Sequence, residues 1–210
     1  MYNLPYFKES DQQQVLSFMR EHPFVMLCGS DKKGRPLATQ VPVLMKESGE
    51  RLMLEGHIMR NTDHHKAFVE NPQALAVFTG AHTYVSASWY SNPNQASTWN
   101  YMSVQAHGKI QFLEEEELRR ILMETTTKYE EGKESPAAYH NLRPEYINNL
   151  IKAIVGFHMV VEEVGNVFKL SQNRDEPSFH NIMDELNARD GDAREIAAHM
   201  QRIKDELYNK

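Results

Sequence analysis

The sequence predicts an α+β fold, in which a small antiparallel β-barrel is flanked by helices and followed by a C-terminal helical hairpin. Three observations predict it. Six or seven short β-like segments are separated by brief turns, residues 104–112 alternate apolar and polar side chains, and helical patterns occupy both ends of the chain. At 210 residues with 40% apolar content, the chain can bury one substantial core, or one core with a helical appendage.

In the first half, a helix is expected over residues 11–21, with Ser10 or Asp11 as its N-cap and Pro23 just beyond its end. A second helix is expected over residues 61–70, capped by Asn61 or Thr62 and ended by Asn71-Pro72. The apolar run Ala74–Phe78 predicts a strand that is buried on both faces. The strands expected in this half are Phe24–Ser30, Leu37–Met45, Arg51–Gly56 and Ala74–Phe78.

In the second half, Val104–Phe112 carries the clearest period of two, which predicts one inward and one polar face. Four glutamates open a predicted helix over Glu114–Tyr129, where they suit its positive N-terminal end. A further helix is expected over residues 144–152, strands at Ile154–Val161 and Val167–Leu170, and two helices from Pro177 onward joined at Asp190-Gly191-Asp192. We therefore expect a barrel domain over residues 1–172 and a helical extension over 173–210, packed on the barrel or a partner subunit.

Composition narrows the class of protein. The net charge is −6, and residues 1–110 carry 10 Lys/Arg and 9 Asp/Glu while residues 111–210 carry 13 and 20. This acidic balance argues against a broad nucleic-acid footprint but allows a local cationic pocket. Without a signal segment or a membrane-length apolar run, the expected location is cytoplasmic. The single cysteine, Cys28, is expected to be a buried structural thiol.

The segment His57–Lys66 joins a predicted strand to a predicted helix. Its cationic side chains, Arg60, His57, His65 and Lys66, lie close to a helix N-terminus, which suits a phosphate. A capped surface helix with exposed histidines explains the same residues equally well, and both interpretations stay open. Adjacent His64 and His65 point about 100° apart on a helix, which disfavours a shared metal ion.

The segment Tyr84–Gly108 holds both tryptophans, Trp89 and Trp99, on either side of a polar loop over Ser91–Thr98. Aromatic walls with hydroxyl and amide groups are typical of a site for a planar ligand. Aromatic packing at a subunit interface is the alternative. No nucleophile elbow or Gly-x-Gly-x-x-Gly phosphate fingerprint is present.

Several multi-residue motifs, spread in order over nearly the whole chain, are similar to the PaiB-type family of FMN-binding split-barrel proteins, described as negative transcriptional regulators of protease production and sporulation. The motifs are Tyr6-Phe7, Pro36–Pro42, Gly56-His57 with Arg60, Gly80–Tyr90, Thr98–Tyr101, His107-Gly108, Ile154–Phe157 and Lys169–Asn173.

The resemblance implies a homodimer related to pyridoxine-phosphate oxidases, with FMN at the subunit interface. Residues Thr39–Pro42 would lie along the flavin and the segment His57–Lys66 would take its phosphate. This chain departs from the family pattern after Arg60, where it reads Asn61–His65 in place of Ala-Asn-Pro-Gln-Trp, so phosphate contacts there are left open. The implied cofactor-binding residues are Thr39, Gln40, Val41, Pro42, His57, Arg60, Asn61, His65, Lys66, Trp89, Trp99, Asn100 and Tyr101.

Three functions compete at this point. The leading one is an FMN-binding regulator, and the second is a flavin-dependent oxidoreductase or haem-handling enzyme, with His57, His82 and His107 as candidate acid–base groups. The third is direct DNA binding by the C-terminal helices. The last is disfavoured because residues 177–210 carry seven acidic against five basic side chains.

Overall fold

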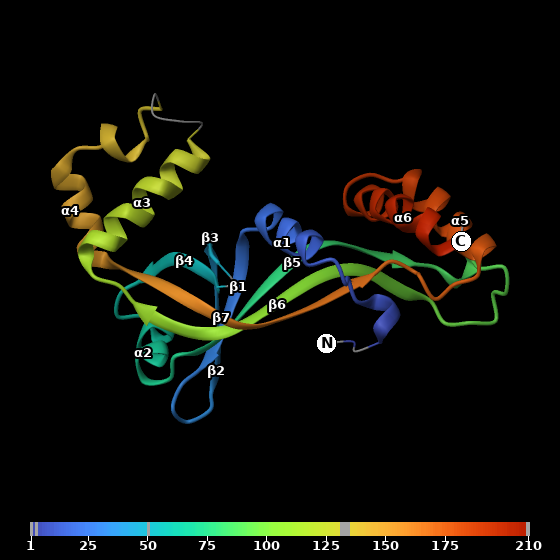
Figure 1. The fold of residues 1–210 in the computed structure, drawn as a ribbon, viewed down its shortest axis with the longest axis horizontal. Coiled ribbons are helices and arrows are strands. Elements are labelled where there is room, and N and C mark those ends of the chain that lie inside the picture. Colours follow the sequence, from blue (N-terminus) through green and yellow to red (C-terminus); the bar gives the residue numbers. More distant parts are fainter. Residues whose placement is uncertain (1, 3, 50, 131–134, 209–210) are drawn as a thin grey trace. The chain divides into compact units, whose positions relative to one another are not determined.

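The computed structural model describes residues 2, 4–49, 51–130 and 135–208 (Figure 1). The described α-helices are α1 (Gln12–Glu21), α2 (Asp63–Glu70), α3 (Glu115–Tyr129), α4 (Pro144–Ala153), α5 (Glu176–Asn187) and α6 (Asp192–Tyr208). The strands are β1 (Phe24–Ser30), β2 (Pro36–Pro42), β3 (Leu44–Ser48), β4 (Arg51–Met59), β5 (Gln73–Val85), β6 (Thr98–Phe112) and β7 (Ile154–Lys169). Short 3₁₀ turns lie at η1 (Pro5–Phe7), η2 (Ala87–Trp89) and η3 (Tyr139–Asn141). The α+β prediction is confirmed.

The seven described strands form one sheet in the order β2-β1-β5-β6-β7-β4-β3. Strands β2 and β3 occupy opposite ends of this order, yet only Val43 separates them in the chain. The sheet must therefore curl until its two ends approach each other without pairing, which makes it an open barrel. The single strand predicted over Leu37–Met45 is wrong, because pairing with β1 ends at Phe24–Pro42 and pairing with β4 begins at Leu44–Glu55. Pro42, which lacks an N–H, lies at the point of transfer.

The chain divides into two compact units, each described here by itself. The first contains residues 1–21, 79–104 and 165–210, and the second contains 22–78 and 105–164. In the first unit, α5 and α6 pack together as the predicted C-terminal hairpin (Figure 1), and Gly191 at their junction has a φ of 62°. In the second unit, α3 packs against α4 and against β4. The predicted boundary between residues 172 and 173 stays a prediction.

Burial follows the predicted alternation where one face of a strand meets the core. Val104, Ala106 and Ile110 are buried on β6, while Gln105 and His107 are not. On β5, however, Ala74 and Phe78 are buried but Val77 is half-buried, so the prediction of a strand buried on both faces is wrong.

Two further predictions are corrected by the structure. The strands expected at 154–161 and 167–170 form one continuous strand, β7. The sequence did not indicate this continuity, because the middle section, Glu162–Val164, is exposed and carries no apolar pattern. Cys28 is half-buried rather than buried, since alternate side chains of β1 face outward. Burial still raises the pKa of the Cys28 thiol, which disfavours the reactive thiolate. Among the described residues, no helix is long and apolar enough to cross a membrane.

Candidate functional site

The N-terminus of α2 is organised by short-range hydrogen bonds. Thr62 is the N-cap, and its Oγ1 accepts from the backbone N–H of His65 at 3.4 Å and donates to the carbonyl of Met59 at 2.8 Å. Asn61, in the left-handed region with a φ of 65°, donates its N–H to His65 Nδ1 at 3.0 Å. Of the two predicted caps, Thr62 is the correct one. The turn that Asn61 makes brings the end of β4 directly against the start of α2.

Cationic groups gather at this turn. Arg60 is held by a hydrogen bond from its Nε to the carbonyl of Ile154 at 3.1 Å, and Lys66 is exposed one residue beyond His65. Burial, followed by the charges of Arg60, His64 and Lys66, lowers the pKa of His65. Burial also lowers the pKa of His57, on β4. Burial is the larger cause of the lowered pKa of His65 and the neighbouring cations add to it, while Asp63 contributes one carboxylate to the same first turn of α2.

Strand β2 approaches the same region. A Cβ on Gly56 of β4 would lie 3.0 Å from the carbonyl oxygen of Pro42, and a Cβ on Gly29 of β1 would lie 2.3 Å from the ring of Phe68 on α2. Helix α2 also packs against both β1 and β2. The structure therefore brings the predicted residues on β2, β4 and α2 onto mutually packed elements of one unit.

The four predicted residues on β2 do not present the same groups. The side chain of Val41 is buried in the core, whereas Gln40 is exposed, and Thr39 and Pro42 are half-buried. Because β2 ends the sheet order, β1 is its one hydrogen-bonded neighbour among the described strands. Backbone N–H and C=O groups on its other side are available to a ligand in the way that edge strands offer them.

A cavity of about 550 Å³ opens beside this cluster. Arg60, His65 and Lys152 line it together with the apolar side chains of Phe112 and Leu118. Glu114 and Glu115 also line it, so the cavity carries charges of both signs. Its volume lies within the range of about 300–1,000 Å³ that is typical of small-molecule and cofactor sites.

The remaining four predicted residues belong to the other unit and do not form one cluster there. The ring of Trp89 is covered by the guanidinium of Arg189 at 4.8 Å, whereas Trp99 is 53% exposed and contacts Tyr84 edge-to-face at 6.0 Å. Asn100 is fully buried and accepts a hydrogen bond from Ser171 at 3.0 Å. Tyr101 is half-buried, and burial raises its pKa. On an extended strand, Asn100 faces away from Trp99 and Tyr101.

Part of the polar loop that follows Trp89 serves the fold. Ser91 donates its hydroxyl to the carboxylate of Asp175 at 3.0 Å and its N–H to Ser178 Oγ at 2.9 Å. Asp175 is itself the N-cap of α5, accepting from the N–H of Ser178. Ser91, at the start of the polar loop, therefore helps to hold the start of α5.

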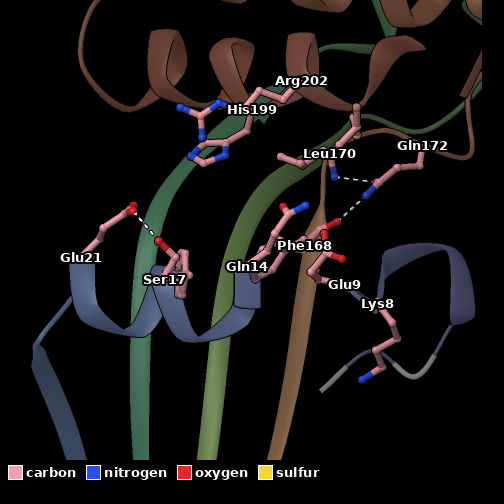
Figure 2. Close-up of a pocket in the computed structure, with 12 residues that line it drawn as sticks. Lys8, Glu9, Gln14, Ser17, Glu21, Phe168, Leu170, Gln172, His199 and Arg202 are labelled. Atoms are coloured by element: carbon pink, nitrogen blue, oxygen red, sulfur yellow. Dashed lines mark hydrogen bonds between the residues drawn. The ribbon is translucent and has the colours of Figure 1, made fainter. Parts of the chain in front are cut away.

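A second cavity, of about 350 Å³, lies within the first unit (Figure 2). Figure 2 shows Gln14, Ser17 and Glu21 of α1 on one side and His199 and Arg202 of α6 on the other. Ser17 donates to Glu21 at 3.0 Å. Because acidic and basic side chains both line this cavity, its charge favours no particular class of ligand.

Sequence reasoning assigned no role to two buried or half-buried cations, Lys169 and Arg174. Lys169 is only 7% exposed at the end of β7. The available signal was a lysine inside the otherwise apolar run Val167–Leu170. A lysine is almost never fully buried unless its charge is paired.

Comparison with known structures defines the class of fold. The flavocytochrome Anf3 from Azotobacter vinelandii superposes with a TM-score of 0.56 at 19% identity, over 80% of this chain and 72% of that one. The FAD and heme binding protein from Mycobacterium smegmatis gives a TM-score of 0.56 at 14% identity, over 78% and 73%. These likenesses identify the fold as a split β-barrel.

The family follows from closer relationships. Residues 1–163 match the family described as "Putative FMN-binding domain". The chain is also 32% identical over 202 residues to "Protease synthase and sporulation protein PAI 2" of Bacillus subtilis, covering 96% of this chain and 97% of that protein. The chain therefore belongs to the PaiB-type family of FMN-binding split-barrel proteins. The family prediction and its cofactor, FMN, are confirmed.

Proposed function

We propose that this protein is an FMN-binding regulator of the PaiB type, which holds the phosphate of FMN at the N-terminus of α2. The supporting observation is the convergence of β2, β4 and α2, where Arg60, His65 and Lys66 concentrate positive charge. A phosphate dianion is stabilised there by charge-assisted hydrogen bonds and by the positive end of the helix.

The residues present fit this group even though the segment after Arg60 differs from the family pattern. Thr62 uses its hydroxyl to cap α2, and Asn61 provides the left-handed turn, so both have local tasks in shaping the site. The terminal guanidinium nitrogens of Arg60 remain available, since the hydrogen bond to Ile154 uses Nε. The edge of β2 offers backbone donors and acceptors to a planar ring. The roles of Trp89, Trp99, Asn100 and Tyr101 stay predictions.

When bound, FMN supplies one- and two-electron redox chemistry. In this proposal the chain orients the flavin and limits its contact with water, in a homodimer of the kind that the family resemblance implies. The name of the B. subtilis relative refers to protease synthesis and sporulation. A regulatory role without direct DNA contact fits the net charge of −6.

The test compares FMN with riboflavin, which lacks the phosphate. We expect the fluorescence of FMN to be quenched when it binds. We also expect FMN to raise the pKa of His65, because a nearby negative charge favours the protonated ring, and the NMR shifts of the imidazole protons measure this pKa. Riboflavin should leave that pKa unchanged. Arg60→Met should weaken FMN binding about tenfold or more and riboflavin binding little, since charge-assisted hydrogen bonds contribute about 1.5–3 kcal/mol.

The matched control is Lys32→Met, which removes an exposed lysine paired with Glu70 at the far end of α2. It should leave FMN affinity unchanged. Equal affinity for FMN and riboflavin, or an absence of any flavin uptake, would contradict the proposed phosphate site.

The alternative is a flavin-dependent oxidoreductase or a haem-handling enzyme. The flavocytochrome and the FAD and heme binding protein share this fold, which is the observation that favours it. Oxidation of NAD(P)H that depends on added FMN would favour this alternative. For the regulator, a gel-shift titration at several salt concentrations should show no steeply salt-dependent DNA binding.

A further inference from the structure

The end of β7 places the charge of Lys169 inside the first unit, with no acidic partner among the described residues. Lys169 is 7% exposed, and its ammonium donates to Thr98 Oγ1 and to the carbonyl of Trp99, the latter at 2.6 Å. It also lies 5.9 Å from the ring centre of Tyr2 and 5.8 Å from that of Phe7. Two neutral oxygens use two of its three N–H donors, so one donor remains.

A second cation lies close by. Arg174 stacks on Tyr90 at 4.0 Å and donates to its hydroxyl at 3.1 Å and to Gln95. Within the part of the chain that the structure describes, neither Arg174 nor Lys169 has a carboxylate partner. Burial, and then the charge of Arg174, lower the pKa of Lys169. Burying cations without compensation is unfavourable, and an anion from outside the chain would offset it.

Both cations line one small cavity of about 170 Å³. Lys169, Ser171 and Asn173 line it, whereas Phe168, Leu170 and Gln172 line the cavity of Figure 2; β7 ends at Lys169, and Ser171 just beyond it has a φ of 67°. The cavity also has an aromatic wall and polar side chains. Its other lining residues are Tyr2, Leu4, Tyr6, Phe7, Thr98, Asn100 and Arg174.

One ring of the aromatic wall, Phe7, is fixed to the fold. Phe7 is buried and contacts Tyr6 edge-to-face at 4.5 Å. Immediately after it, Glu9 and Asn166 exchange two hydrogen bonds, at 2.8 and 3.0 Å, which tie this segment to β7. These hydrogen bonds therefore help to hold Phe7 in place, while Tyr2 and Tyr6 are about half-exposed.

We propose that this cavity is a second ligand site, separate from the α2 phosphate site, which binds a small organic carboxylate between Lys169, Arg174 and the aromatic wall of Tyr2, Tyr6 and Phe7. The two cations and the hydroxyl and amide groups of Ser171 and Asn173 recognise the carboxylate, and the rings contact its apolar body. A cavity below the roughly 300–1,000 Å³ of drug-sized sites accommodates only a small ligand. The aromatic wall favours an organic acid over a bare phosphate ion.

Benzoate is a suitable probe, benzamide is its uncharged isostere, and inorganic phosphate tests the competing anion. We expect benzoate, but neither of the others, to raise the unfolding temperature of the full chain at millimolar concentration and to give a calorimetric binding isotherm. Lys169→Met and Arg174→Gln should each weaken benzoate binding by about tenfold or more. Lys33→Met, at an exposed lysine in the turn after β1, should leave it unchanged.

Each other outcome overturns the proposal. Unchanged benzoate affinity in both cavity variants would place binding elsewhere. Stabilisation by phosphate alone would exclude a site for an organic carboxylate. No binding of any probe would leave Lys169 as a purely structural link between Thr98 and the rings. If Lys169→Met fails to fold, Arg174→Gln, at a half-exposed residue, decides the question. FMN titration of the same variants should be unchanged, which separates this site from the proposed phosphate site.

Discussion

The ion pair between Glu55 and Arg120 should anchor α3 to β4. Arg120 donates to both carboxylate oxygens of Glu55, at 2.7 and 2.9 Å, and to Glu124 at 3.0 Å. The side chain of Glu55 is 6% exposed and that of Arg120 is 37% exposed. Replacing Arg120 with Met removes the cation and leaves the Glu55 carboxylate buried without its partner.

The expected loss follows from this partial burial. Removing one partner of a fully buried pair costs about 3–5 kcal/mol, whereas exposed pairs contribute about 0–1 kcal/mol. Because water reaches Arg120 but hardly reaches Glu55, we expect Arg120→Met to lower the free energy of unfolding by about 2–3 kcal/mol. In a chain of this size that corresponds to a fall of about 4–12 °C in the unfolding temperature.

Urea unfolding followed by far-UV circular dichroism is the appropriate assay, since both tryptophans lie in the other unit. Glu55→Gln and the double variant Glu55→Gln/Arg120→Met complete a double-mutant cycle. The stability lost in the double variant should be smaller than the sum of the two single losses by at least about 1 kcal/mol. Lys109→Met is the matched control, because its pair with Glu162 is about half-exposed on both sides, and it should change stability by less than about 0.5 kcal/mol. A loss in Arg120→Met no larger than the control's would refute the reasoning.

Three further results are expected in urea unfolding experiments. Gly108→Ala should destabilise the protein by about 2–3 kcal/mol, because the added Cβ would lie 2.1 Å from the carbonyl oxygen of Val160. His107→Ala, at the exposed neighbouring residue, should have little effect. Equal losses in the two variants would contradict the steric explanation. Burial lowers the pKa of His57 from 6.5, so parent stability should fall as pH drops below 6.5, and His57→Gln should flatten that slope; an unchanged slope would exclude His57 as its source. Burial alone would raise the pKa of Glu124, but hydrogen bonds from Lys46 and Arg120 lower it below 4.5, so this stabilisation is full above pH 4.5 and lost on acidification. Glu124→Gln should therefore be less stable than the parent at pH 7 and approach it in acid, and a constant difference would argue against the ion pair.

Much of the candidate phosphate site could be predicted from the sequence because its signals are local. Thr62 caps a helix that starts one residue later, and Arg60, His65 and Lys66 lie within one turn of that start. The cavity lined by Lys169 and Arg174 could not be predicted in this way, because Lys169, Thr98 and Tyr2 are far apart in the chain. Only the pairing of distant strands brings such residues together.

The sequence by itself determined the elements whose causes lie within a few residues. The α1 and α2 boundaries, the alternation along β6 and the hairpin around Gly191 all rest on caps, period and turn chemistry. Only the tertiary structure decided where the strand through Val43 breaks, that β7 continues through Glu162–Val164, and that Asn100 is buried and accepts a hydrogen bond from Ser171. Those outcomes depend on which strand pairs with which, and pairing between distant segments leaves no signature in the neighbouring residues.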